Sequence, residues 1–246
     1  MNGIFRAKTC KADRRGRKHG HLAGREVAAV PAEVIREFIL LKFPTATCRG
    51  DQLPIACDMS DLRCDALIEN RACPPMSGFT QEPIWDVVLE SCHADAGRWM
   101  LLPRLTAETR AAERWARFFA WENVAIDGPR RGIKILSFPR RLPGVTAVEF
   151  TRHYRDVHGP LVAAAEAFQR HINRYVQHHV IAESVQASAD AFEPYDAVAE
   201  FWVDSIDDAW AAWNSREYRE IIRPDRNSFM GPSDRIAVDE TTIHRR

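Results

Sequence analysis

The clearest alternation of apolar and polar residues lies in the C-terminal half of the chain. A short apolar run at residues 133–138 is closed by Pro139 and followed by the turn pair Pro143 and Gly144. Runs of this length between proline and glycine are typical of a β-strand. The pattern therefore predicts a strand that ends at a tight turn.

A helix is predicted to begin directly after this turn. Thr146 and Glu149 have the spacing of a capping box, in which each side chain accepts a hydrogen bond from the backbone N–H of the other residue. The apolar residues that follow at helical spacing are Phe150, Tyr154, Val157 and Leu161. The dipeptide Gly159-Pro160 predicts the end of the regular helix, because proline lacks an N–H donor and restricts the residue before it.

This prediction places His158 at a helix end, with Tyr154 one turn earlier on the same face. A phenol and an imidazole that project together are suited to proton transfer. The alternative is structural, because a helix C-terminus favours a cation and His158 supplies one. Spacing alone leaves both interpretations open.

Three motifs then occur in a fixed order along the chain. They are EFTRHYRDVHGPLV at residues 149–162, Tyr-Val-Gln at residues 175–177, and YDAVAEFWVDS at residues 195–205. With the preceding strand and Pro-Gly turn, this pattern resembles the EthD-domain family over residues 132–243.

The resemblance implies a small α+β fold. Members have ferredoxin-like antiparallel sheets with helices on one face, and two such sheets pair as a dimeric α/β barrel. The resemblance also implies a loose association with oxidoreductase pathways and, through fungal relatives, with the tailoring of aromatic polyketides.

The N-terminal half contains segments similar to the strands of the C-terminal half. The similar pairs are residues 37–44 with 133–139, 64–73 with 174–180, 85–90 with 195–200, and 117–126 with 234–243. A repeat of about 110 residues is therefore predicted. For the first of these segments, a helix opened by Pro31 is an alternative to a strand.

We expect a degenerate EthD-like half at residues 31–128 and an EthD-like domain at residues 132–246. Between Pro44 and Cys64 there is no T-x-x-E cap and no His-Gly-Pro, so the first helix of that half is degenerate or lost. The halves pair either within one chain, as a monomeric pseudo-dimer, or between two chains, as a homodimer.

The strand predicted at residues 196–203 alternates regularly. Its apolar face is expected to lie against the helices and consists of Ala197, Ala199, Phe201 and Val203. Val198, Glu200 and Trp202 point the other way, into the barrel. Burial there would raise the pKa of Glu200 and make it a candidate general base. It is alternatively a solvated edge residue or the partner of an arginine.

The strand of the Tyr-Val-Gln motif carries two neighbouring histidines. Val176, His178 and Val180 are expected to face the helices. Gln177 and His179 are thereby directed toward the cavity, and His178 is a satisfied core histidine. Adjacent strand residues point to opposite faces and do not ligate one ion, so no metal site is predicted.

A second capping box is predicted from the spacing of Ser205 and Asp208. The apolar residues at helical spacing behind it are Ile206, Ala209, Trp210 and Trp213. Aromatic residues in this pattern are typical of core packing, so the two tryptophans are predicted to lie in the core.

Composition narrows the possible partners and compartments. The 246 residues include 34 Lys and Arg and 34 Asp and Glu, so there is no charge excess to attract a nucleic acid. No apolar run approaches the roughly 18 residues of a membrane span.

All six cysteines lie in the first 92 residues without a C-x-x-C pair, which favours reduced thiols in the cytoplasm over zinc. Residues 1–30 are basic without the apolar stretch of a secretory signal, and we expect a disordered tail.

These observations give one main functional hypothesis and two alternatives. The candidate catalytic residues are His158, Tyr154, Glu200 and His179, and the candidate substrate-binding residues are Trp202, Gln177 and Val198. We expect proton transfer or oxidoreductase-linked chemistry on an aromatic or polyketide-like small molecule in the barrel, without cofactor or metal. The alternatives are a ligand-binding or accessory subunit of an oxidoreductase system, and a purely structural protein.

Overall fold

The computed structural model describes residues 34–44, 66–73, 83–93, 110–188 and 193–245. The predicted tail at residues 1–30 lies outside these ranges, and so does most of the segment where the first helix is predicted to be degenerate. Cys73 and Cys92 lie inside them and are free thiols.

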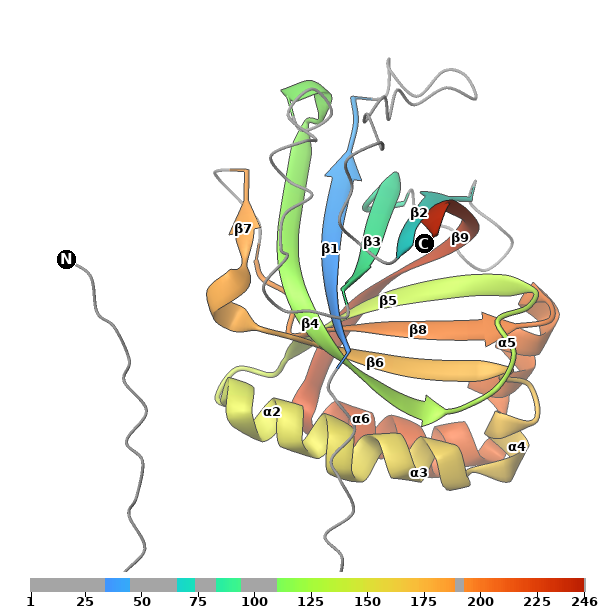
Figure 1. Ribbon diagram of the computed structural model, residues 1–246. Coiled ribbons are helices and arrows are strands. Elements are labelled where there is room, and N and C mark those ends of the chain that lie inside the picture. Colours follow the sequence, from blue (N-terminus) through green and yellow to red (C-terminus); the bar gives the residue numbers. More distant parts are fainter. Residues whose placement is uncertain (1–33, 45–65, 74–82, 94–109, 189–192, 246) are drawn as a thin grey trace, which may run out of the picture. The chain divides into compact units, whose positions relative to one another are not determined.

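Eight strands of a nine-stranded sheet close into an antiparallel barrel (Figure 1). They are β1 (Ile35–Lys42), β2 (Ala66–Ala72), β3 (Val87–His93), β4 (Arg114–Ile126), β5 (Ile133–Arg141), β6 (Arg174–Val180), β8 (Ala197–Val203) and β9 (Met230–Arg245). The hydrogen-bonded order is β1-β3-β2-β9-β5-β8-β6-β4, and β4 returns to β1. The short β7 (Gln186–Ala187) pairs with β4. β1 confirms the strand interpretation of its segment over the alternative helix.

Two long strands close the ring. β4 pairs with β1 through residues 114–121 and with β6 through residues 120–126. β9 pairs with β5 through residues 230–238 and with β2 through residues 238–245. Because each long strand hydrogen-bonds to two neighbours in succession, the barrel has no open edge between its eight strands.

The strand order repeats along the chain. The first four strands are ordered β4-β1-β3-β2, and the strands of the C-terminal half are ordered β9-β5-β8-β6. The segments at residues 85–90 and 195–200, which are similar in sequence, lead into β3 and β8 at equivalent positions of these two orders. All four strand pairs predicted from the sequence are thus strands.

Helical segments cover the outer face of the β9-β5-β8-β6 sheet (Figure 1). They are α2 (Ala147–His153), the π-helix η3 (Tyr154–His158), α3 (Gly159–Ala164), α4 (Glu166–Gln169), α5 (Ile206–Asn214), the π-helix η5 (Tyr218–Ile222) and α6 (Arg223–Phe229). A short 3₁₀ turn, η4 (Ala182–Ser184), follows β6. Both predicted N-caps are present: Thr146 forms a full capping box with Glu149, and the Ser205 hydroxyl accepts from the N–H of Asp208.

The predicted faces of β8 are confirmed. Ala199, Phe201 and Val203 belong to the core beneath the helices. Val198 belongs to a second core inside the barrel, where it packs with residues such as Phe38. The alternation is unambiguous here because one face is wholly apolar.

The predicted faces of β6 are wrong. Tyr175 and Gln177 lie beneath the helices, where Tyr175 stacks on Phe201 with ring centroids 4.5 Å apart. His178 lies inside the barrel, 5.0 Å from the ring of Phe38. Both faces of this sheet are buried, so the more apolar face does not have to be the one that meets the helices.

The predicted helix end at Gly159-Pro160 is also wrong. The helical run continues from α2 through η3 into α3, and the N–H of Gly159 bonds to the carbonyl of Tyr154 five residues earlier. A π-helical turn is wider than an α-helical one, and it accommodates a proline that has no donor to offer. His158 therefore lies within a helical run, and the argument from a helix C-terminus does not apply to it.

Candidate functional site

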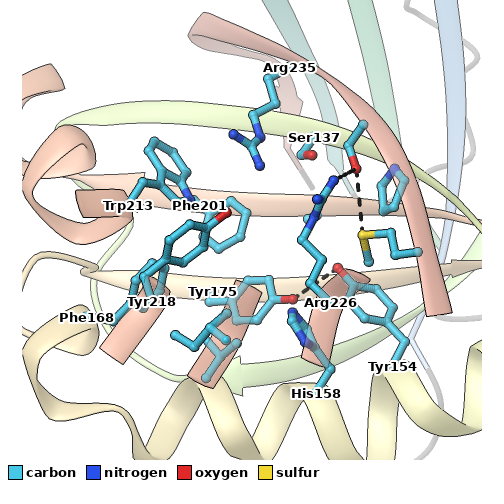
Figure 2. A pocket seen from close by; sticks show the side chains of 16 residues that line it. Ser137, Tyr154, His158, Phe168, Tyr175, Phe201, Trp213, Tyr218, Arg226 and Arg235 are labelled. Carbon is cyan, nitrogen blue, oxygen red and sulfur yellow. Dashed lines mark hydrogen bonds between the residues drawn. The ribbon is translucent and has the colours of Figure 1, made fainter. Parts of the chain in front are cut away.

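A pocket lies between the outer face of the C-terminal sheet and the helices that cover it (Figure 2). Its cavity volume is about 40 Å³, and the wider space between its side chains, including the part open to solvent, is about 430 Å³. Sixteen residues line it, drawn from β5, β6, β8, β9 and the helices. The pocket therefore lies outside the barrel, whereas the sequence predicts a cavity inside it.

His158 enters this pocket from η3. Its side chain is buried, and its Nδ1 atom lies 2.7 Å from Oδ2 of Asp225 on α6. Oδ1 of the same carboxylate lies 2.8 Å from Nε2 of His153. Burial alone would raise the pKa of Asp225, but the hydrogen bonds from the two histidines outweigh it and hold the pKa below its usual range.

An ionised carboxylate only accepts hydrogen bonds, so Asp225 fixes the tautomer of its neighbour. Neutral His158 carries its proton on Nδ1, and its Nε2 lone pair is left to accept a proton. Figure 2 shows the imidazole rising from the helix toward the two tyrosines and Arg226. This is the arrangement of a general base held by a carboxylate.

A chain of hydrogen bonds orients Tyr154 beside this base. Asn123 donates to Oε1 of Gln177 at 2.8 Å, and Nε2 of Gln177 donates to the Tyr175 hydroxyl at 3.1 Å. The Tyr175 hydroxyl then donates to that of Tyr154 at 3.0 Å. The hydroxyl proton of Tyr154 is not used in this series of hydrogen bonds, so it can be donated to a ligand.

Both phenols are held in the protonated form. Burial, together with Tyr175, raises the pKa of Tyr154 well above its usual value. Burial raises the pKa of Tyr175 to about 12. The rings of Tyr154 and His158 are 5.6 Å apart. The site thus presents a phenol that remains a hydrogen-bond donor next to the imidazole of His158.

The rest of the pocket combines aromatic rings with positive charge. The aromatic side chains are Phe168, Phe201, Trp213 and Tyr218. Arg226 and Arg235 also line the pocket, and the guanidinium of Arg235 lies 5.1 Å from the ring centroid of Trp213. Trp213 packs on the core as predicted, but Trp210 is exposed.

The structure divides the predicted site residues between the two faces of the sheet. His158 and Tyr154 line the pocket, and Gln177 supports it from β6. His179 lies on the same side, 5.3 Å from the Tyr154 ring. Val198, Glu200 and Trp202, on the other side, belong to the barrel interior. The seven residues therefore do not form one site.

Glu200 is engaged in an ion-pair network inside the barrel. Lys134 lies 2.6 Å from Glu90, 2.9 Å from Glu240 and 3.4 Å from Glu200. Burial alone would raise the pKa of Glu200, but the charge of Lys134 and the hydrogen bond with His178 hold it well below its usual range. The expectation of a raised pKa is wrong, because burial comes with a cation.

Of the residues that have a role in the site, four are absent from the sequence-based candidates: Tyr175, Arg226 and Arg235, which line the pocket, and Asp225, which lies beside it. Asp225 and Arg226 follow Pro224, where an acidic residue in the first turn of a helix is ordinary. Only the fold brings them to His158. Tyr175 could have been found from the sequence, because the alternation along β6 places it on the same face as Gln177.

Two further features, a metal-binding cluster and a membrane-spanning helix, are not seen in the described ranges. No group of three or more His, Cys, Asp or Glu side chains there is arranged to hold a metal ion. No helix in those ranges is long and apolar enough to span a bilayer.

Known proteins resemble the chain in fold. A crystal structure of an anthrone oxidase-like protein superposes with a TM-score of 0.52 at 8% identity, covering 85% of this chain and 93% of that one. A proposed monooxygenase from Fusobacterium nucleatum subsp. nucleatum gives a TM-score of 0.51 at 8% identity, covering 88% and 100%. These likenesses show a shared α+β barrel fold. No curated protein matches the chain in sequence at a significant level.

The family comparison agrees with the motifs of the C-terminal half. The model of the EthD domain matches residues 142–233, which include Tyr154, His158 and Asp225. Over these residues the chain matches the EthD domain.

Proposed function

We propose that the protein is an enzyme that transfers protons on an aromatic small molecule bound in the pocket. The observation that carries the proposal is the position of His158, between the Asp225 carboxylate and the Tyr154 phenol. An imidazole whose tautomer is fixed, beside a protonated phenol, combines a base with a hydrogen-bond donor. The aromatic wall of the pocket favours a planar substrate.

The first chemical step removes a proton next to a carbonyl or from a phenol. The proton moves to Nε2 of His158, and the electron pair of the broken bond moves onto the substrate oxygen. Tyr154 donates a hydrogen bond to that oxygen, and Asp225 stabilises the imidazolium. Loss of water and cyclisation of a polyketide-like substrate proceed from such an anion, and loss of carbon dioxide from a β-keto acid leaves one behind. Oxidation of the anion requires in addition an external two-electron oxidant, such as dioxygen, to take up the electrons.

The proposal extends to the organisation of the chain. Residues 31–128 and 132–246 are two EthD-like halves, the first degenerate, that pair within one chain as a pseudo-dimer. The repeated strand order supports this, and so do β4 and β9, which each continue from their own sheet onto the other. Sedimentation is expected to give the 28.0 kDa mass of one chain, and a dimer mass would contradict it.

The function is tested by comparing small-molecule profiles of four versions of the source cell. They are the intact strain, a deletion, and strains with His158→Gln or His171→Gln at normal protein level. His171 is the matched control because it also pairs with an aspartate, Asp208, at 3.1 Å, but does not line the pocket.

We expect the deletion and His158→Gln to accumulate the same metabolite, which is then the substrate or its precursor. The His171→Gln strain should match the intact one. If the deletion accumulates a metabolite but His158→Gln does not, proton transfer by His158 is excluded. The pocket then serves a binding or accessory subunit.

A further inference from the structure

Two arginines face the pocket without a carboxylate partner in the described part of the chain. Arg226 donates to the carbonyl of Gly231 at 3.0 Å and to the hydroxyl of Ser233 at 2.9 Å, which are neutral acceptors. Arg235 contacts Trp213 through its guanidinium. Elsewhere, by contrast, ion pairs are common: Arg36 with Glu122, Arg117 with Glu37, and Arg140 with Asp234.

The charge of these arginines is not cancelled by the acid that lies near the pocket. Asp225 is hydrogen-bonded to His158 through Oδ2 and to His153 through Oδ1. Both carboxylate oxygens are therefore already engaged by histidines. Burial and the like charge of Arg235 lower the pKa of Arg226. The pocket therefore has a positive end that a ligand must complement.

The aromatic side chains lie beside these cations. Trp213 meets Phe201 edge to face, and Tyr218 stacks on Phe168 with ring centroids 5.8 Å apart. Arg235 lies over Trp213. Both guanidinium groups and these aromatic side chains line the same pocket, and guanidinium groups bind carboxylates through paired N–H donors.

We propose, building on the proton-transfer function above, that the substrate is an aromatic carboxylate. Its carboxylate binds Arg235 and Arg226, and its rings lie among Trp213, Tyr218 and Phe201. The remaining edge of the substrate then faces His158 and Tyr154. The arginines select and orient the substrate, and the histidine and tyrosine act on it.

The inference is tested by calorimetric titration of the full chain with three pairs of probes. The carboxylates are benzoate, 2-naphthoate and anthracene-2-carboxylate, and the neutral partner of each is its primary amide, which has the same shape. We expect at least one carboxylate to bind about tenfold or more tightly than its amide, because a charged hydrogen-bonded pair is lost in the amide.

The substitutions assign this preference to the pocket. Arg235→Met is expected to remove the preference while leaving amide binding unchanged, and Arg226→Met is expected to weaken it. Arg216→Met is the matched control, because this arginine is exposed and pairs with Glu220 away from the pocket.

The outcomes separate this inference from the proposed function. Equal binding of acid and amide, binding of neither in all three pairs, or a preference that survives Arg235→Met would overturn the aromatic carboxylate. The titrations do not depend on turnover. A different pair of results would support the aromatic carboxylate as the ligand and exclude proton transfer by His158. These results are a preference that is lost in Arg235→Met and an unchanged metabolite profile in the His158→Gln strain.

Discussion

Nδ1 of His158 lies 2.7 Å from Oδ2 of Asp225, although the two residues are 67 positions apart in the sequence. The contact joins η3 to α6, so it connects the two helical segments that border the pocket. Because the other oxygen of the carboxylate holds His153, Asp225 is fixed in place by two rings. The base and its orienting group are therefore built into the packing of the helices.

Replacing Asp225 by Asn tests this relationship. The amide has one accepting oxygen for the two rings. With its NH2 toward Nδ1 of His158, the ring proton moves to Nε2, which is the wrong tautomer for a base, and with its oxygen there, the uncharged amide stabilises the imidazolium less. We expect kcat/KM for the metabolite found in the strain comparison to fall about a hundredfold or more. Asp208→Asn is the control because Asp208 holds His171 outside the pocket. An equal loss of kcat/KM in both variants would show that the loss does not depend on the contact between Asp225 and His158.

The sequence predicted the parts of the fold that depend on local chemistry. Thr146 and Ser205 are side-chain caps, and their partners lie three residues away, so spacing alone identifies them. The same holds for Tyr154 and His158, which one helical turn brings together. These features need no knowledge of the tertiary structure.

What the sequence did not predict depends on contacts between distant segments. Asp225 becomes part of the site only when α6 packs against η3. The face of β6 was misassigned because Gln177 is buried with its amide fully used, by Asn123, by Tyr175 and by the Tyr154 carbonyl. A polar residue satisfied in this way is as compatible with a buried face as an apolar one.

Gly159→Ala is expected to destabilise the protein. An added Cβ would lie 3.1 Å from Oε1 and 3.2 Å from Nε2 of Gln177, the amide that holds the Tyr154 carbonyl and the Tyr175 hydroxyl. Displacing this amide should lower the free energy of unfolding by about 1–2 kcal/mol, measured by urea titration. In an isolated helix alanine would instead be favourable.

A double-mutant cycle provides the control for this prediction. In a Gln177→Ala background the added methyl group meets no amide, so Gly159→Ala should there be neutral or stabilising by up to about 1 kcal/mol. The same loss in both backgrounds would contradict the role of Gln177.

Lys134 in the barrel interior is predicted to be a major determinant of stability. Its side chain is buried and faces Glu90, Glu200 and Glu240, whose charges raise its pKa although burial alone would lower it. Lys134→Met leaves these carboxylates without their shared cation and should lower the free energy of unfolding by about 3–5 kcal/mol.

Lys42→Met is the comparison for that measurement. Lys42 pairs with Asp86 at 2.8 Å but is partly exposed, so its loss is expected to cost about 1 kcal/mol or less. Urea titration of both variants at one pH gives the two values. Similar costs would show that the interior network contributes no more than a surface pair.

His179 is predicted to make stability depend on pH. It is buried, stacks on Trp121 at 3.8 Å, and neither ring nitrogen has a hydrogen-bond partner in the described structure. Burial, with His178 and Arg155, lowers its pKa from 6.5 to about 3, although Asp156 opposes this. The folded protein thus keeps the ring neutral while the unfolded chain takes up a proton below pH 6.5. The stability that the neutral ring contributes is present above that pH and is lost as the pH falls toward 3.

Relative to His179→Phe, the intact protein should lose about 2 kcal/mol of unfolding free energy between pH 7 and pH 5 in urea titrations. Parallel pH profiles of the two proteins would contradict this.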